Sequence, residues 1–438
     1  MQGTSSLRLL GPRTAALAVF FVANSILLNV VLAVLPWTPQ GKTVFNYSAR
    51  AIIGRAQSDS WGQMHIALEE FRAHPEAPLY DDVFFRRHIR FPYAPPSLLL
   101  TSMVERLPVN EFAVLHFLSW LVFVATVLIT VRLFRRSTDR DGHAAATGRL
   151  DRVVTSILVA GFTLTFYPVV KGFTLGQIQT WINLSLTGAL LSWTAGSEAR
   201  GGVLAALPCL VKPQYGILLL WGLSRRHWRF CNAFSAVLVG ALAISIATFG
   251  WANHRSYLWM LSYISAHGES YFANQSVNGL LQRAVFNGEN LTWREDAYPP
   301  FNPGVYAGTL LAALTLIGFC LFWAPRASRR ASATDLMIAI LTCVLASPVA
   351  WEHHYGILLP IYALLFPVLY QQRVFGRATL PWLAASYILT SNYFGIAQLA
   401  AGTRANPLQS HLLLGAVMVL VGLYRLRGLE QTAEEESS

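Results

Sequence analysis

The residues that could perform chemistry occur in a few short stretches between long apolar segments. They are carboxylates, amides and imidazoles, which can take up a proton, bind a hydroxyl or hold a phosphate. The arginine distribution predicts that all of them face one side of a membrane. A carrier would need such groups near mid-depth, reachable from both sides, so this placement favours a membrane enzyme. The stretches are Asp59, Phe91–Pro96, Gly176-Gln177, Asn274-Gln275-Ser276 and Trp351-Glu352-His353-His354.

The composition is that of a polytopic membrane protein. Of 438 residues, 54% are hydrophobic and 13% are charged, and the mean hydropathy is +0.43. An ordinary soluble domain has about a quarter of its residues charged. The net charge of +11 comes from arginines in short loops. No continuous basic groove with interleaved aromatic residues accompanies them, so no nucleic-acid partner is expected. The four cysteines form no C-x-x-C pair, which argues against a zinc site.

Apolar segments of about 20 residues, the length that crosses a bilayer, predict about ten full transmembrane helices. Arg8 and Arg13 precede the first span, and arginines recur in alternate loops, so both termini are expected in the cytoplasm. The prediction is an all-α polytopic membrane protein with one domain over residues 1–429 and a disordered, acidic cytoplasmic tail over 430–438. The expected spans are residues 15–35, 112–133, 153–170, 178–194, 230–249, 305–323, 336–349, 355–370, 380–396 and 412–426.

Two large loops, residues 37–111 and 251–304, are expected on the extracytoplasmic side. Each contains apolar residues at helical spacing with polar residues between them. This pattern is typical of helices that lie on a membrane surface, and such helices can cover a cavity in the bundle. The two apolar stripes are Trp61, Met64, Leu68 and Phe71 in the first loop and Tyr257, Leu258, Leu261 and Ile264 in the second.

A lysine–proline pair interrupts the segment that follows Arg200. Only about 24 residues separate the arginines on either side of it, too few for two full crossings. Because Pro213 removes a backbone donor, we expect two half-helices, residues 201–211 and 215–223, that meet at Lys212. An ammonium group at such a break is costly unless it meets an anion, and a lipid phosphate is the obvious partner. A lysine that only solvates backbone carbonyls is the alternative.

Asp59 has two possible roles. It stands where an amphipathic helix begins, so it could cap the helix N-terminus, and Ser60 with Gln63 could form a capping box. A carboxylate at the mouth of a lipid-accessible cavity could instead take the proton from an acceptor hydroxyl as that hydroxyl attacks. Local sequence leaves both roles open.

Two adjacent histidines, His353 and His354, stand at the start of an expected span. Neighbouring positions on a helix point about 100° apart, so the pair is not expected to share a metal ion. H-x-x-x-H spacing is also absent from the sequence. One imidazole could hold a phosphate or stabilise a leaving group, and an interfacial aromatic belt is the alternative. Arg90 and Lys171 could add positive charge near the same face.

Together these motifs resemble glycosyltransferase family 87, the polyprenol-phosphate-mannose-dependent α-mannosyltransferases. The resemblance runs from Asp59 to about Leu359. It implies the GT-C fold, with Asp59 as the first-loop catalytic base and with donor-phosphate contacts at the His-His motif and the Lys-Pro break. The motifs that carry it are Phe91-Pro92-Tyr93-Ala94-Pro95-Pro96, Leu175-Gly176-Gln177, Val211-Lys212-Pro213, Asn274–Gly279 and Ser347-Pro348 with Trp351–His354.

The sequence departs from the family pattern at three places, and at one of them Lys212-Pro213 is followed by Gln214-Tyr215. The usual Tyr-Pro-Pro is Tyr93-Ala94-Pro95-Pro96 here, and Gln179 replaces the asparagine commonly found two residues after the Gly-Gln glutamine. These departures bear on the choice of sugar and acceptor.

The resemblance implies an inverting enzyme that needs no metal or other cofactor. It would move a sugar, with mannose as the first expectation, from a polyprenyl-phosphate donor to a hydroxyl of a lipid or glycan acceptor, forming an α-linkage. The site is expected at the extracytoplasmic face of a bacterial inner membrane, among membrane lipids. The expected phosphate ligands are Lys212, His353, His354, Arg90 and Lys171. The expected donor or acceptor pocket contains Tyr93, Gln177, Gln179, Asn274, Gln275, Asn278, Trp351 and Glu352.

Two alternatives remain at this point. A transporter or flippase of a lipid-linked glycan would also use lateral lipid entry and a basic groove, but it would need intramembrane polar groups that both sides can reach. Another GT-C enzyme could use arabinofuranose as its sugar or a protein as its acceptor.

Overall fold

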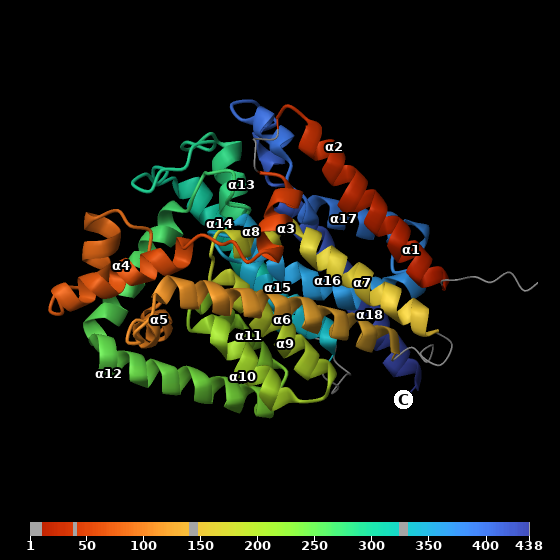
Figure 1. Cartoon of the computed structure of the whole chain (residues 1–438), viewed down its shortest axis with the longest axis horizontal. Helices are drawn as coiled ribbons and strands as arrows, with labels where there is room; N and C mark the ends of the chain where they lie inside the picture. The colour runs from red at the N-terminus through yellow and green to blue at the C-terminus, as the bar shows by residue number, and fades with distance from the viewer. Residues whose placement is uncertain (1–10, 38–41, 140–147, 324–331, 438) are drawn as a thin grey trace, which may run out of the picture.

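The computed structural model describes residues 11–37, 42–139, 148–323 and 332–437. This part of the chain is helical apart from turns and one isolated bridge between Asn274 and Trp351, so the expected all-α class is confirmed. The α-helices (Figure 1) are α1 Pro12–Phe21, α2 Leu28–Val34, α3 Val44–Ile52, α4 Asp59–Ala73, α5 Leu98–Val104, α6 Glu111–Asp139, α7 Arg149–Thr165, α8 Tyr167–Thr174, α9 Gln179–Thr194, α10 Glu198–Cys209, α11 Ile217–Ser224, α12 Trp228–His267, α13 Val277–Ala284, α14 Pro303–Phe322, α15 Ala333–Leu345, α16 Leu358–Gln371, α17 Thr379–Ser391 and α18 His411–Ser437.

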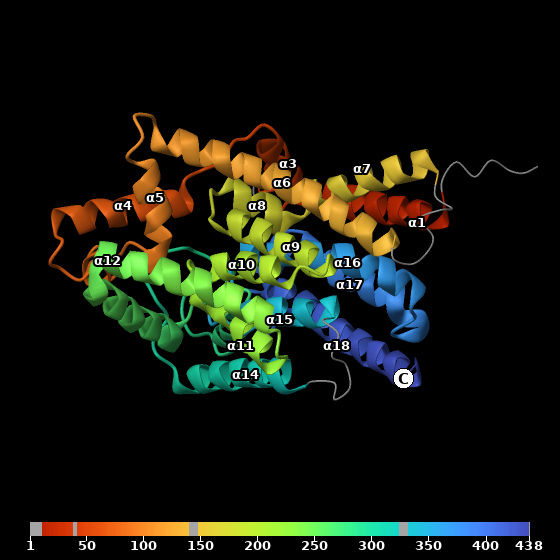
Figure 2. The same cartoon turned by 90° about the horizontal axis from the view of Figure 1, so that it is seen from below.

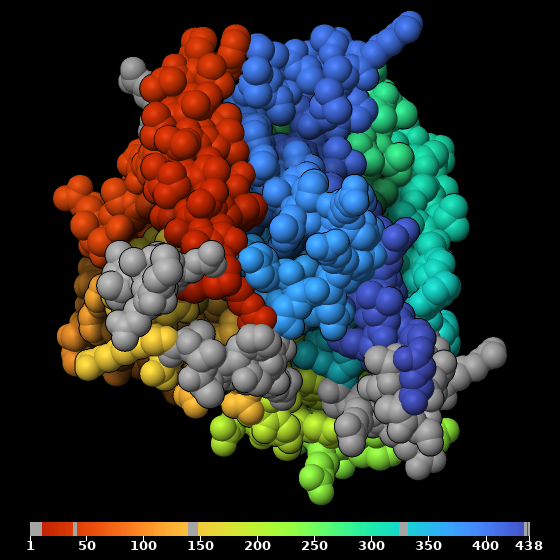
Figure 3. Space-filling view, turned by 90° about the vertical axis from the view of Figure 1, so that its right-hand side faces the viewer, coloured from red at the N-terminus to blue at the C-terminus, as the bar shows by residue number. Residues whose placement is uncertain are grey.

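The two ends of the helical bundle are built differently. The start of α1 and the end of α18 lie at one end, and α4 and α5 lie at the other (Figures 1 and 2). The first helices pack beside the last ones (Figure 3). In this contact Asn29 Nδ2 donates to Asn392 Oδ1 at 2.8 Å. Segments from the two ends of the sequence are therefore in contact on one side of the bundle.

The number of membrane spans is smaller than expected. Six helical segments of the described residues are long and apolar enough to cross a membrane, or seven if the bent pair α7–α8 counts as one. The prediction of about ten full spans is therefore wrong by this criterion. Helices α9, α15 and α17 have only 16, 13 and 13 residues. α15 is buried from Thr334 to Leu345. A helix enclosed by protein is as apolar as a lipid-facing one, but it needs no membrane-spanning length.

The interruption at Lys212 is confirmed. α10 ends at Cys209 and α11 begins at Ile217, with a short 3-10 turn over Pro213–Gly216 between them. The backbone of Lys212 is extended, with φ −131° and ψ 101°. The lysine side chain is therefore presented from a gap between two short helices.

The helices expected on the membrane surface bury their apolar residues in protein. Trp61 and Met64 of α4 share one buried cluster with Tyr257 of α12. α12 runs beyond its expected span and bends at Gly250, where φ is 76° and ψ is 156°. Its second part leaves Leu258 exposed. The two large loops thus pack against each other. Apolar side chains that could have faced lipid are buried against apolar side chains of the other loop.

The acidic tail is also different from the expectation. α18 extends to Ser437, so the tail that was expected to be disordered is helical through that residue. Ser332 and Thr334 donate hydrogen bonds of 2.8 and 2.6 Å to the carboxylate of Glu430. This anchor lies at the start of the tail, and glutamate is a good helix former, so the helix continues.

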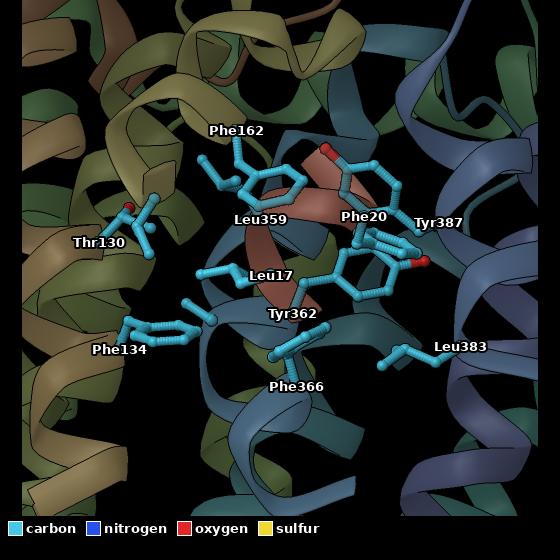
Figure 4. Close-up of a pocket in the computed structure, with 12 residues that line it drawn as sticks. Leu17, Phe20, Thr130, Phe134, Phe162, Leu359, Tyr362, Phe366, Leu383 and Tyr387 are labelled. Atoms are coloured by element: carbon cyan, nitrogen blue, oxygen red, sulfur yellow. The ribbon is translucent and has the colours of Figure 1, made fainter. Parts of the chain in front are cut away.

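An apolar cavity lies inside the bundle between α1, α6, α7, α16 and α17 (Figure 4). Its volume is about 40 Å³. The Tyr362 hydroxyl lies 3.2 Å from Ser386 Oγ, and the Tyr387 hydroxyl lies 3.4 Å from Ser25 Oγ. Because both tyrosine hydroxyls have hydrogen-bond partners, the surface that lines the cavity is mainly hydrocarbon. The lining residues are Leu17, Phe20, Thr130, Phe134, Val159, Phe162, Leu359, Tyr362, Ala363, Phe366, Leu383 and Tyr387.

Candidate active site

Gly176 brings the start of α4 against the turn between α8 and α9. Its φ is +72°, and a Cβ at this position would lie 1.8 Å from the carbonyl oxygen of Gln57. Glycine is therefore required here. The Asp59 N–H donates to the Leu175 carbonyl at 3.0 Å, and the Ser60 N–H donates to the Gly176 carbonyl at 3.3 Å. These backbone bonds hold Asp59 beside the Gly-Gln motif.

The carboxylate of Asp59 is held by a side chain. Asp59 is the first residue of α4, Ser58 is the N-cap, and no side chain caps this helix, so the capping interpretation is wrong. Instead, Gln177 Nε2 donates to Asp59 Oδ2 at 2.5 Å. Burial raises the pKa of Asp59; the Gln177 bond opposes this, Glu295 adds to it, and Lys171 lowers it. A partly exposed carboxylate with a raised pKa is suited to act as a general base.

A buried network of hydroxyls fixes the Gln177 amide. Ser60 Oγ donates to Gln177 Oε1 at 3.0 Å, and the Tyr93 hydroxyl lies 3.3 Å from the same oxygen. The two hydroxyls are 2.7 Å apart, and the Ile178 N–H donates to Ser60 Oγ at 3.0 Å. Because Oε1 accepts these bonds, the amide nitrogen must point toward Asp59. Tyr93 and Gln177, two of the expected pocket residues, thus lie next to the expected base.

Lys212 lies in a second polar group with one histidine of the pair. Its Nζ donates to Gln179 Oε1 at 3.0 Å and lies 2.6 Å from His354 Nε2. Lys212, His353 and His354 are all buried. The two imidazole centroids are 4.7 Å apart. Among the described residues, His353 Nδ1 is buried without a hydrogen-bond partner. A buried cation and an unsatisfied ring nitrogen together suit an anion.

Lys171 is already paired with a carboxylate. It forms an ion pair with Oε2 of Glu352, and it also donates to the Tyr167 hydroxyl at 2.9 Å. The Tyr167 hydroxyl in turn donates to Glu352 Oε2 at 3.2 Å. Glu352 is fully buried and Lys171 nearly so. Lys171 therefore contributes half of an ion pair, not a free positive charge for a phosphate.

The guanidinium of Arg90 is surrounded by protein groups at its edges and on its faces. It pairs with Glu269 Oε1 at 3.2 Å and donates to three backbone carbonyls of residues 294–297. Its guanidinium carbon lies 4.2 Å from the ring centroid of Trp293 and 4.0 Å from that of Tyr298. Burial raises the pKa of Glu269 to about 7, which the guanidinium opposes. This geometry argues against Arg90 as a phosphate ligand.

Three expected pocket amides have structural partners. Asn274, Gln275 and Asn278 are fully buried. In each, the amide nitrogen donates a hydrogen bond and the amide oxygen accepts one, which uses the groups that could have recognised a sugar. Their partners are backbone or side-chain groups of Glu269, Phe272, Thr309, Pro348, Ala350, Gln409 and Leu412.

Residues 91–348, more than half of the chain, match the model of glycosyltransferase family 87. The chain belongs to glycosyltransferase family 87. It is therefore a membrane glycosyltransferase, which decides against the transporter alternative. No curated protein matches the chain. The family 87 match includes Gln177 and Lys212, but it begins after Asp59 and ends before His353. The roles of these last two residues depend on the geometry described above.

Two residues of this family 87 chain take part in the site region without any sequence signal of their own. Glu269 is an isolated acid after an amphipathic helix, and Trp293 stands in a polar loop. The one local sequence feature that points to Glu269 is Gly268, the residue before it. Its φ is +61°, and a Cβ there would lie 1.9 Å from Asn278 Oδ1. A glycine next to an acid can mark a close approach of two segments.

Proposed function

We propose that this enzyme transfers mannose from a polyprenyl-phosphate donor to a hydroxyl of a lipid or glycan acceptor, with inversion at the sugar C1. One observation carries the proposal. Gln177 binds Asp59, and Gln179, two residues later, binds Lys212. Residues two apart lie within ~7 Å of each other, because consecutive Cα atoms are 3.8 Å apart. A base and a cation are thus anchored to the same turn.

The chemistry follows from this pairing of opposite charges. The acceptor oxygen attacks C1 of the donor sugar while its proton passes to Asp59. The bond between C1 and the phosphate oxygen breaks, and the departing phosphate retains its electron pair. Lys212 stabilises the negative charge that develops there. Attack on the face opposite the phosphate converts a β-linked donor into an α-linked product.

The histidine pair supplies further contacts to the phosphate. His354 accepts or shares a proton with Lys212 at 2.6 Å. His353 Nδ1, without a partner among the described residues, is available as a donor to a phosphate oxygen. Lys171 and Glu352 remain an ion pair beside this group and keep the polar region in place.

The apolar cavity supports an isoprenoid donor. α16 begins directly after the turn that contains His354, and its residues Leu359, Tyr362 and Phe366 line the cavity. A hydrocarbon chain attached to a phosphate at Lys212 could extend along α16 into this space. The apolar lining of this cavity is suited to such a chain. We propose that the site faces the extracytoplasmic side of a bacterial inner membrane, where lipid-linked donors are used.

The test is a transfer assay with purified enzyme in lipid nanodiscs and a total glycolipid extract as acceptor. Three radiolabelled donors are compared: polyprenyl-phosphate-mannose, polyprenyl-phosphate-arabinofuranose and GDP-mannose. We expect a labelled glycolipid from the first donor, with α-configuration by glycosidase digestion, and none from Asp59→Asn. Product from the arabinofuranose donor alone would replace the sugar. Product from GDP-mannose alone would overturn the lipid-donor proposal.

A further inference from the structure

Three aromatic rings from distant parts of the sequence meet beside the histidine pair. The centroids of Trp293 and Trp351 are 4.7 Å apart, and Tyr271 lies 5.5 Å from Trp293 and 6.2 Å from Trp351. All three side chains are partly exposed. We call Tyr271, Trp293 and Trp351 the aromatic platform. The catalytic steps above make no use of it.

Buried charges hold the platform from behind. Trp351 Nε1 donates to Glu269 Oε2 at 2.9 Å, and Arg90 joins Glu269 to the face of Trp293. Burying an ion pair carries a desolvation cost, so its benefit here is orientation rather than stability. The tryptophan of an interfacial belt points its N–H toward lipid headgroups. The N–H of Trp351 is already occupied by Glu269, so this residue offers its ring face and edge.

The platform adjoins the site at the histidine pair, and the loop that carries Trp293 approaches the base. The Trp351 ring lies 5.9 Å from that of His353. Glu295, two residues after Trp293, is close enough for its charge to raise the pKa of Asp59. The donor sugar is fixed by its phosphate at Lys212, whereas the group that approaches Asp59 is the acceptor. The surface on the Asp59 side is therefore available to the acceptor.

We propose that the aromatic platform binds one face of a pyranose ring of the acceptor glycan. The C–H groups on one face of a pyranose are apolar and slightly positive, and they complement the negative face of an indole or phenol ring. Arg90 and Glu269 are then positioning residues that set the planes of Trp293 and Trp351. The inference depends on the proposed glycosyl transfer for the identity of the ligand as acceptor.

The experiment measures binding, so that it does not depend on turnover. Saturation-transfer difference NMR is recorded on the enzyme in nanodiscs with octyl α-mannopyranoside below its micelle concentration. We expect saturation of the sugar C–H protons of one face. In Trp293→Ala and in Tyr271→Leu the apparent affinity should fall about three- to tenfold. Among the described residues, no hydrogen bond or cation–π contact joins the Tyr271 side chain to Arg90 or Glu269, so the Tyr271 variant tests the platform even if Trp293→Ala does not fold.

A matched control is Trp259→Ala on α12, whose side chain is 66% exposed and lies outside the platform. It should leave the sugar signals unchanged. Equal sugar signals in all variants, or saturation confined to the octyl chain, would overturn the proposal. The transfer assay could fail with every polyprenyl donor while the sugar signals still depend on the platform residues. That outcome would refute the proposed reaction but support sugar binding by the platform.

Discussion

Two polar clusters of similar composition occupy this molecule, and they differ in how their hydrogen bonds are used. The reaction cluster contains Asp59, Gln177, Gln179, Lys212 and His354, whose side chains bind one another. The scaffold cluster contains Arg90, Asn274, Gln275 and Asn278, which bind mainly backbone groups of neighbouring loops.

The difference separates residues that act on a substrate from residues that shape the loops. Buried polar groups are nearly always satisfied, and those satisfied by backbone lock a fold. Asp59 is partly exposed, and among the described residues the neighbouring His353 has an unpaired ring nitrogen. In the scaffold cluster the amides are fully buried and bonded at both ends. Residue type alone does not distinguish the two clusters, whereas the hydrogen-bond partners do: Gln177 and Gln179 bind the charged side chains of Asp59 and Lys212, and the scaffold amides bind mainly backbone groups.

The largest expected effect is on Asp59. Asp59→Asn should lower kcat by about 10²–10⁴-fold because a general base is lost, with the melting temperature and the KM for the donor unchanged. Steady-state transfer and thermal melting in nanodiscs measure these quantities. Asp81→Asn, in the same loop, is the control and should retain activity. Full activity in Asp59→Asn would show that Asp59 is not the general base.

The second effect concerns Arg90 of the scaffold cluster. Arg90→Met should lower the free energy of unfolding by about 3–5 kcal/mol, because Glu269 is left buried without its partner. The melting temperature reports this loss, and the double variant Arg90→Met/Glu269→Gln should recover part of it. A normal melting temperature with a raised KM for the donor would instead make Arg90 a phosphate ligand.

The third effect contrasts two lysines. Lys212→Met should lower kcat by about 10²–10³-fold through loss of charge stabilisation at the leaving phosphate, without lowering the melting temperature. Lys171→Met should lower the melting temperature, because Glu352 remains buried and unpaired. The opposite pattern in the same two assays would exchange the roles of the two lysines.

The smallest effect is a change of pH dependence in Gln177→Leu. Asp59 must be ionised to act, and its hydrogen bond from Gln177 lowers a pKa that burial raises. Without that bond the pKa rises further, so the acid limb of the kcat profile should move to higher pH. Above the limb the loss should stay below about tenfold. Gln275→Leu should lower stability and leave the limb in place; an unmoved limb in Gln177→Leu would contradict the network.

The sequence by itself determined the features that depend on local chemistry. Apolar composition and length predicted an all-helical membrane protein, and Pro213 predicted the break that presents Lys212. The order of the motifs predicted the family that the comparison then established over residues 91–348. Polar residue types also indicated which short stretches to consider, among them the Gly-Gln motif that holds Asp59.

The tertiary structure decided what depends on partners far away in the chain. Several apolar segments proved to be short helices enclosed by protein, because burial in a bundle and burial in lipid select the same residues. Arg90 and Lys171 looked like free cations until Glu269 and Glu352, 179 and 181 residues away, were placed beside them. Whether a polar group recognises a substrate or supports the fold depends on such pairings, and the sequence does not record them.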